Sequence, residues 1–408
     1  MESIDRPTIQ RSAIDLAEDV KLRAPRGAAE KLAHYGGAEV AAALLKLSPG
    51  FTQDVLSHLP ADTRERALAA APVEFARQWQ RNALYEEGSI GRMMEPLYAA
   101  FPPQATVGQA IEALHELVKH AFITYIYVVD DEERLLGIVT MRDLLFNDHA
   151  RALRDVMLTD VFALHAPTPL DEAMKQVLDR HYPVYPVVDA ENRIRGLVRG
   201  QSMFEARAFD IAAQPGSMVG VEKEERMGTP WQRSLIMRHP WLQLNLLTAF
   251  LAAAVVGVFQ DTIDRLVILA LFLPVLAGQS GNTGCQALAV TLRGMTIGEL
   301  RPGSERALIT KEAGLGLLNG AGVGLVAAIG MYVTASSQNS AHPFLLAFVV
   351  FIAMIGSCVA SGLSGAMVPL TLKRLGFDPA TASSIFLTTA TDVVSMGMLL
   401  GLAALLVR

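Results

Sequence analysis

The sequence contains little cysteine, and its second half contains little charge. The 408 residues include two cysteines, Cys285 and Cys358, and both lie in apolar segments. Two such residues give no basis for a disulfide framework or for a thiolate metal site. Residues 1–20 contain no long apolar run. We therefore expect no signal peptide, and we expect the first half of the chain to stay in the cytoplasm.

Charged side chains divide the chain near residue 237. Residues 1–237 carry 26 Lys and Arg against 34 Asp and Glu, whereas residues 238–408 carry 9 against 7. The acidic first part argues against nucleic acid as a partner and is compatible with cations. The second part consists mainly of five apolar runs, at residues 240–259, 266–292, 313–335, 344–372 and 380–407.

Each apolar run is long enough for a membrane-spanning helix, which needs about 20 residues. Basic residues gather in the second-to-third and fourth-to-fifth connecting loops, at Arg293, Arg301, Arg306, Lys311, Lys373 and Arg374. The other two loops contain only one Lys or Arg between them, Arg265. Because basic loops usually face the cytoplasm, we expect five spans and a carboxyl terminus outside the cell.

The fifth apolar run contains a single ionisable side chain, Asp392. An isolated carboxylate at that depth costs about 2.5 to 3.5 kcal/mol on insertion scales, so it usually faces a bundle interior or a water-filled path. Thr381, Ser384, Thr388 and Ser395 recur at helical spacing around it. We interpret Asp392 as the centre of an ion pathway. The alternative is an aspartate that bonds to another span for packing alone.

The second apolar run is unusually polar in its middle. It contains Pro274, three glycines (Gly278, Gly281 and Gly284) and five polar side chains (Gln279, Ser280, Asn282, Thr283 and Gln286). Irregular backbone at that depth is tolerated where it lines a cavity, so the run predicts a pore lining. Close helix packing through the glycines is the alternative, but it does not account for the polar side chains.

The first part of the chain has a helical pattern between residues 31 and 81. Pro49, Pro60 and Pro72 each follow an apolar cluster. This spacing predicts short helices that stop and restart in a small superhelix. A plain helical bundle without repeats is the alternative.

A tandem duplication follows the helical region. Residues 125–140 are matched 59 residues later by residues 185–198, and each copy predicts a strand, an acidic turn and a second strand. This arrangement resembles a pair of cystathionine-β-synthase (CBS) domains, which are regulatory modules.

The first copy contains GIVTMRD at residues 137–143, which fits the pattern with which many CBS domains hold an adenine nucleotide. The resemblance makes Thr140 and Asp143 candidate nucleotide-binding residues and allows ATP at the first CBS domain. The alternative is that these two residues only start and cap a helix. The second copy has lost both residues.

A connector at residues 211–237 links the duplication to the apolar runs. It carries the charged sequence EKEER at residues 222–226, and we expect a helix capped near Ser217. Such a connector could pass movement of the soluble part to the membrane part, although a charged run is usually just a solvated face.

Motifs along the whole chain resemble those of the MgtE magnesium channels. They are YEEGSIGRMM at residues 85–94, RHPWL at 238–242, GNTGCQ at 281–286, LGFDPA at 375–380 and TATDV at 389–393. The resemblance implies a multidomain membrane protein with four parts: an all-α superhelical domain (1–86), an α/β tandem CBS pair (87–210), a connecting plug helix (211–237) and a five-helix pore domain (238–408).

The resemblance also implies a homodimer in a bacterial inner membrane, with a pore on the two-fold axis. Asp392 matches the family's selectivity carboxylate, and oxygen ligands suit Mg²⁺, a hard cation that dehydrates reluctantly. The partners implied are a second copy, the lipid bilayer and Mg²⁺. The candidate pore residues come from the second and fifth spans: Asp392, Thr388, Ser384, Gly281, Asn282, Thr283 and Gln286.

Gating by cytoplasmic Mg²⁺ is a further implication of the resemblance. The candidate regulatory ligands are acidic residues of the soluble part, the connector and the start of the fifth span: Asp189, Asp210, Glu222, Glu224, Glu225 and Asp378. Arg195, Arg199 and Arg207 lie in the second CBS region, where a denser acidic surface would be expected. We therefore predict a gate that depends less steeply on Mg²⁺.

Three other functions are compatible with parts of the sequence. A transporter of the same build could carry Co²⁺ or Mn²⁺, although no His or Cys lies near Asp392 to favour softer metals. An intramembrane aspartyl protease needs two carboxylates in one site, and no second Asp or Glu lies in an apolar run, so we expect no enzyme. A membrane-anchored nucleotide sensor would not need polar faces on its spans.

Overall fold

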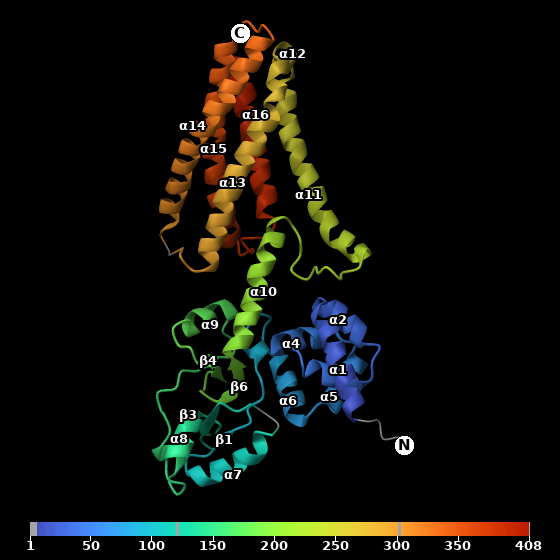
Figure 1. The fold of residues 1–408 in the computed structure, drawn as a ribbon, viewed down its shortest axis with the longest axis vertical. Helices are drawn as coiled ribbons and strands as arrows, with labels where there is room; N and C mark the ends of the chain where they lie inside the picture. The colour runs from blue at the N-terminus through green and yellow to red at the C-terminus, as the bar shows by residue number, and fades with distance from the viewer. Residues whose placement is uncertain (1–5, 120–121, 301–302, 408) are drawn as a thin grey trace. The chain divides into compact units, whose positions relative to one another are not determined.

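The structure is a computed structural model that describes residues 6–119, 122–300 and 303–407 (Figure 1). The chain forms two compact units. The soluble unit comprises the described residues up to Asp210 together with Arg226–Thr229. The membrane unit comprises Ile211–Glu225 and the described residues from Pro230 onward.

The soluble unit begins with six short helices. They are α1 (Arg6–Lys21), α2 (Pro25–Leu32), α3 (Gly37–Leu44), α4 (Pro49–His58), α5 (Ala61–Ala70) and α6 (Val73–Asn82). Pro49 is in the first turn of α4, and Pro60 and Pro72 immediately precede α5 and α6. A proline is tolerated there because the first N–H groups of a helix have no partner within it. The predicted helix restarts are confirmed.

Alternate helices of this region pack against one another: α1 against α3, α2 against α4, and α3 against α5. This is the arrangement of a superhelix. Gly37 permits the contact between α3 and α5, because a Cβ there would lie 2.6 Å from the carbonyl oxygen of Arg66. Leu32, Leu44 and Val55 lie in the shared apolar core.

Each copy of the duplication forms a three-stranded sheet with two helices. The first contains β1 (Ala100–Phe101), α7 (Val107–Leu117), β2 (Tyr125–Val129), β3 (Leu135–Thr140) and α8 (Met141–Phe146). The second contains β4 (Leu164–His165), α9 (Leu170–Val177), β5 (Val184–Val188), β6 (Ile194–Arg199) and α10 (Gly200–Met218). Two 3₁₀ turns, η1 (Ile90–Met93) and η2 (Leu153–Asp155), precede the copies. In both sheets the first strand is parallel to the second and the second is antiparallel to the third.

The two copies agree in detail. Glu133 and Asn192 occupy equivalent turn positions, and both have positive φ, at 64° and 60°. The two turns also meet: Leu135 N–H donates to Asn192 O at 2.9 Å, and Ile194 N–H donates to Glu133 O at 2.9 Å. The predicted duplication is therefore present in the fold, and its copies pair through their turns.

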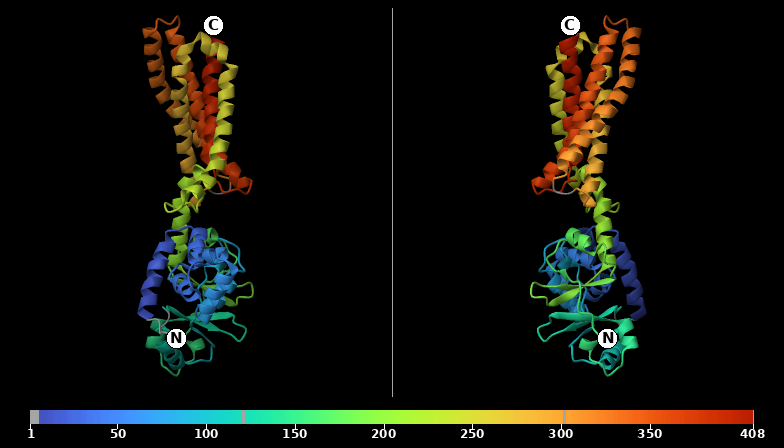
Figure 2. Two further views of the ribbon diagram at one scale, coloured as in Figure 1. Left: turned by 90° about the vertical axis from the view of Figure 1, so that its right-hand side faces the viewer. Right: turned by 90° about the vertical axis from the view of Figure 1, so that its left-hand side faces the viewer.

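The membrane unit contains five long helices. They are α11 (Trp231–Val258), α13 (Leu273–Thr296), α14 (Glu305–Ser337), α15 (Pro343–Arg374) and α16 (Ser383–Leu406) (Figure 2). Two short elements, α12 (Gln260–Arg265) and η3 (Val267–Leu271), connect α11 to α13. Among the described residues, five helices are long and apolar enough to cross a membrane. The five predicted spans are confirmed.

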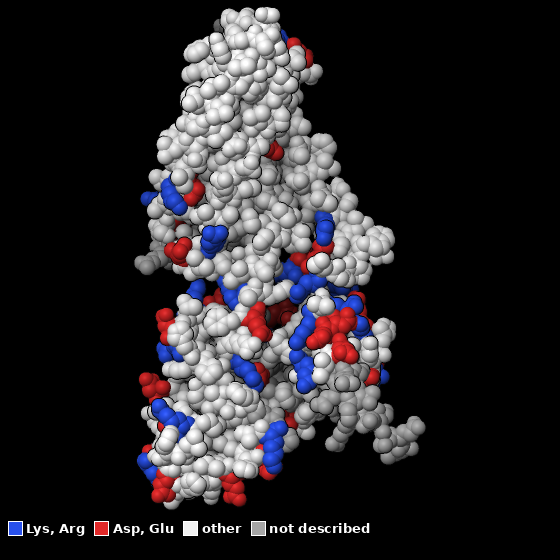
Figure 3. Space-filling view, viewed as in Figure 1, with Lys and Arg blue, Asp and Glu red and all other residues white. Residues whose placement is uncertain are grey.

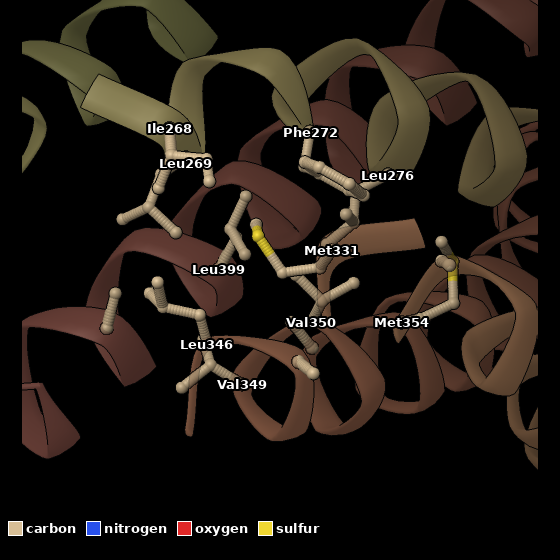
Figure 4. Packing of buried hydrophobic residues seen from close by; sticks show 14 of the residues in the cluster. Ile268, Leu269, Phe272, Leu276, Met331, Leu346, Val349, Val350, Met354 and Leu399 are labelled. Atoms are coloured by element: carbon tan, nitrogen blue, oxygen red, sulfur yellow. The ribbon is translucent and has the colours of Figure 1, made fainter. Parts of the chain in front are cut away.

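α15 is the most buried of these helices, and α13, α14 and α16 all pack against it. Gly316, Gly320 and Gly324 of α14 face it, and a Cβ at Gly316 would lie 2.5 Å from the carbonyl oxygen of Cys358. Small residues allow such close approach between membrane helices. Figure 4 shows part of the apolar core of the membrane unit. Phe272, Met331 and Leu399 belong to this one buried cluster.

The backbone of the second span differs from our expectation. α13 is a continuous helix from Leu273 to Thr296, and Pro274 lies in its first turn, where it breaks no hydrogen bond. Gly284 serves packing, because a Cβ there would lie 2.9 Å from Leu387 Cδ1. A Cβ at Gly278 or Gly281 would meet open space. The predicted irregular backbone was therefore wrong, whereas the glycine-packing alternative holds for Gly284.

The helix that we expected to begin near Ser217 instead ends there. α10 runs to Met218, and Gly220, with φ of 78°, follows its end as helix-terminating glycines commonly do. The acidic residues of the connector therefore lie in turns, and α11 already begins at Trp231. A sequence preference for a capping serine was outweighed by the glycine that stops the preceding helix.

Candidate functional site

Asp392 lies in the middle of α16 and is partly buried within the chain. Among the residues that the structure describes, none donates a hydrogen bond or forms an ion pair with its carboxylate. A carboxylate in an apolar helix needs a polar partner. Water, a cation or another chain can supply that partner, whereas no second span bonds to the carboxylate within residues 6–119, 122–300 and 303–407.

The other polar residues expected on this face separate into different environments. Thr388 is partly buried and donates to Ile385 O at 3.1 Å. Ser395 is fully buried and donates to Asp392 O at 3.2 Å. Thr381 lies before α16, in a turn closed by Asp378. Thr388 and Asp392 lie one turn apart on α16, and both side chains are only partly buried.

Two amides of α13 lie on an exposed face. Asn282 and Gln286 are exposed and one turn apart, so they share one side of the helix. Gly281 and Thr283 are partly buried, and Thr283 donates to Gln279 O at 3.0 Å. Lipid cannot satisfy an exposed amide. This face of α13 therefore suits contact with water, an ion or another chain.

Two further acids, Glu305 and Glu312, lie within a candidate span, contrary to our expectation. α14 begins at Glu305, eight residues before the apolar run, so Glu312 is part of the helix and is 6% exposed. Good helix formers such as Glu and Lys extend the helix beyond its apolar stretch. The Nζ of Lys311 lies 3.6 Å from the Glu312 carboxylate, so this acid has a cationic neighbour, unlike Asp392.

Two of the candidate regulatory acids are already bound by arginine. Asp189 accepts from Arg195 at 2.6 and 2.8 Å and from the backbone N–H of Arg193 at 2.8 Å. Burial raises the pKa of Asp189, but these bonds outweigh it and hold the pKa below its ordinary value. The bonds from Arg238 likewise lower the pKa of Glu225, whose side chain is 3% exposed.

The remaining regulatory candidates have different surroundings. Glu222 and Glu224 are exposed in turns, Asp210 is partly buried, and Asp378 lies 4.0 Å from the Nζ of Lys223. No group of three or more His, Cys, Asp or Glu side chains within the described ranges is arranged to hold a metal ion. These acids stay candidates for a regulatory metal site.

The three arginines singled out in the sequence all have acidic partners within the soluble unit. They are the pairs Arg195–Asp189 at 2.6 Å, Arg199–Glu95 at 2.9 Å and Arg207–Asp171 at 2.5 Å. Asp189 and Arg195 are six residues apart, but the other two pairs join residues 104 and 36 apart, and sequence reasoning missed those two for that reason. Only the folded chain brings them together.

Thr140 and Asp143 form a capping box at the start of α8. Asp143 N–H donates to Thr140 Oγ1 at 3.2 Å, and the hydroxyl donates to the Asp143 carboxylate at 2.7 Å. This is the helix-capping role that the sequence left open.

A cleft lies elsewhere in the CBS pair, beside Arg199 and Glu95. Two buried hydroxyls that line it, on Tyr127 and Thr124, have no hydrogen-bond partner in the described part of the chain. Burial also raises the pKa of Tyr98 in the same cleft to about 12.

The fold and these polar residues define a polytopic membrane transporter that carries a soluble CBS module. Figure 3 shows an almost uncharged surface along much of the membrane unit. The family description MgtE, divalent cation transporter, matches residues 273–402, and that of the CBS domain matches residues 90–149 and 153–208.

The chain is similar over most of its length to curated bacterial proteins. It is 30% identical to the magnesium transporter MgtE of Thermus thermophilus over 333 residues, which cover 80% of this chain and 72% of that protein. It is 29% identical to the magnesium transporter MgtE of Enterococcus faecalis over 79% of this chain and 70% of that protein. The chain therefore belongs to the MgtE family.

Two solved structures are similar to part of the chain. The cytosolic domain of the Mg²⁺ channel MgtE in complex with ATP is 28% identical, with a TM-score of 0.42 over 47% of this chain and 78% of that one. The soluble part of a magnesium transporter is 23% identical, with a TM-score of 0.40 over 45% and 72%. The family assignment rests on the full-length relatives.

Proposed function

We propose that this protein conducts Mg²⁺ across a bacterial inner membrane and that Asp392 is the central ligand of the pathway. The observation that carries the proposal is that the Asp392 carboxylate, within an apolar helix, has no partner in the part of the chain that the structure describes. Mg²⁺ prefers oxygen ligands and retains much of its water. A carboxylate can therefore hold the hydrated ion without stripping it.

The pathway runs between two copies of the chain. One chain supplies a single Asp392, and its Asn282 and Gln286 lie on an exposed face of α13. These polar faces of α13 and α16 would be covered by a second copy of the chain. A two-fold axis would place two Asp392 carboxylates opposite each other, because symmetric dimers use the same surface twice. The further pore residues are Thr388, Gly281 and Thr283.

The membrane orientation follows from the basic loops. With those loops in the cytoplasm, the soluble unit lies in the cytoplasm and the carboxyl terminus lies outside. The protein then senses the ion on the side to which the pathway delivers it. Glu222 and Glu224, exposed in the connector, are the acids best placed to bind cytoplasmic Mg²⁺.

ATP at the first CBS domain is the finer part of the proposal. There Thr140 and Asp143 cap α8 and bond to each other, and both stay candidate nucleotide-binding residues. In the second copy Arg199 pairs with Glu95.

Ion flux into liposomes containing the purified chain tests the proposal. Mg²⁺, Co²⁺, Mn²⁺ and Ca²⁺ are compared side by side in the wild type and in Asp392→Asn. We expect Mg²⁺ flux in the wild type and its loss in the variant. Equal Mg²⁺ flux in both proteins would refute the assignment of Asp392, and a preference for Co²⁺ or Mn²⁺ would favour the softer-metal alternative.

A further inference from the structure

The end of α10 and the start of α16 satisfy each other's backbone groups. Ala382 N–H donates to Ser217 O at 2.8 Å, and the Ser384 hydroxyl donates to Met218 O at 2.7 Å. The last carbonyls and the first N–H groups of a helix have no partner within it. The negative end of the α10 dipole therefore meets the positive end of the α16 dipole, which is the favourable arrangement.

Apolar packing reinforces this junction and extends it to α13. Met218 packs against a small buried cluster formed by Leu288, Leu292, Ala380 and Leu387. One turn earlier in α10, Gln214 Nε2 donates to Thr296 Oγ1 at the end of α13, at 2.7 Å. The end of α10 is thus packed against both helices that carry the candidate pore residues.

Ser384 therefore has a role different from the one its spacing suggested. The sequence placed it on the polar face with Asp392, but its only proton is donated to α10. It lies eight residues before Asp392, about 12 Å along the helix. We propose that Ser384 is a positioning residue that couples α10 to the helix carrying Asp392, and that it does not line the ion pathway.

The coupling has a direction, given the pathway proposed above. Met218 packs against residues near the ends of α13 and α16, so the junction holds these helices in the arrangement of this structure, which we take as the closed one. When the junction breaks, the end of α10 is released and the pathway opens more often. The equilibrium between open and closed channels then changes, whereas the ligands around Asp392 do not.

Single-channel recording of the full chain in planar bilayers separates the two roles. Ser384→Ala removes the donor, Ser384→Thr restores it, and Ser383→Ala is the matched control. Ser383 is the neighbouring residue, and its hydroxyl donates to Ala380 O rather than to α10. We measure open probability against Mg²⁺ on the side of the soluble unit, together with unitary Mg²⁺ current.

We expect Ser384→Ala to raise the ratio of open to closed channels by about two- to tenfold, as the loss of one hydrogen bond implies. Its unitary current stays at the wild-type value, and the Thr and Ser383→Ala variants behave as wild type. A reduced unitary current with unchanged gating would overturn the proposal and return Ser384 to the pore. Unchanged gating and current would also overturn it. Absence of Mg²⁺ current in the wild type would instead refute the proposed function.

Discussion

The acidic residues of the two units differ in what surrounds them. In the soluble unit Asp189 is held by Arg195 and by backbone N–H groups, and Glu95 is held by Arg199. In the membrane unit the Asp392 carboxylate has no partner among the described residues. Removing the partner of a paired acid destabilises a fold, whereas an unpaired acid in an apolar helix costs energy and needs a functional reason. The contrast separates structural carboxylates from the one that we assign to ion passage.

The largest expected effect comes from removing the unpaired acid. In Asp392→Asn each copy loses a charged ligand worth about 1.5 to 3 kcal/mol. In the proposed dimer, which has two copies, Mg²⁺ flux should fall by about a hundredfold or more, while the protein stays folded and its oligomeric state is unchanged. Flux into liposomes and size-exclusion chromatography measure the two outcomes.

Glu312→Gln is the matched control, because it neutralises a buried acid of the described spans. We expect Mg²⁺ flux to continue in this variant. If both substitutions abolished flux equally, the loss would reflect the charge of the bundle and not a ligand at Asp392.

Breaking a paired acid should instead change stability. In Arg195→Ala the partly buried carboxylate of Asp189 loses its guanidinium, which should destabilise the soluble unit by about 1 to 3 kcal/mol. Urea denaturation followed by Trp79 fluorescence measures this in a Trp231→Phe, Trp241→Phe background. Arg142→Ala, at a residue whose side chain is 76% exposed, is the control and should change stability by about 0.5 kcal/mol or less.

The same pair predicts a pH dependence. The folded pKa of Asp189 lies below its ordinary value, so its contribution is fully present above the unfolded pKa of about 3.9. This contribution is lost as pH falls through the folded pKa. As the pH is lowered from about 5 through the folded pKa of Asp189, the free energy of unfolding should therefore fall less in Arg195→Ala than in the wild type. Parallel losses in both proteins would show that Asp189 is not the titrating group.

The spans and the duplication could be predicted because each depends on local sequence. Apolar runs of spanning length identified all five long helices, and the 59-residue repeat identified both sheets. Helix ends were less predictable: Gly220 ends α10 where we expected Ser217 to begin a helix, and α14 starts before its apolar run.

Contacts between distant residues could not be predicted at all. Ser384 and Met218 are 166 residues apart, and nothing in the spacing of either residue indicates the other. The sequence therefore assigned Ser384 to the pore, although it identified Asp392 as the unusual residue. A charged residue in an apolar run, such as Asp392, can be recognised in the sequence. Ser384 is one of several hydroxyl residues in its run, and only the folded structure shows what it contacts.

A neutral polar residue of the pathway should matter less than Asp392. Asn282→Ala removes an exposed amide of α13, a dipole that can orient the water around the ion. Loss of one neutral hydrogen bond of about 0.5 to 1.5 kcal/mol should lower Mg²⁺ flux by about two- to tenfold. Asn319→Ala removes an exposed amide of α14 and should leave flux unchanged. A larger effect at Asn319 would shift the pathway away from α13.

The smallest effect is expected from Lys223, a connector residue that pairs with Asp378. Its Nζ lies 4.0 Å from the carboxylate, and the two side chains are 46% and 43% exposed. Exposed pairs of this kind contribute about 0 to 1 kcal/mol, so Lys223→Gln should change the ratio of open to closed channels by about fivefold at most. The variant leaves the backbone bond from Ala382 to Ser217 in place, so most of the junction survives. The shift should also shrink as ionic strength rises, because salt screens exposed charges. A shift larger than that of Ser384→Ala, and insensitive to salt, would mean that the ion pair and not the helix-end junction couples the connector to α16.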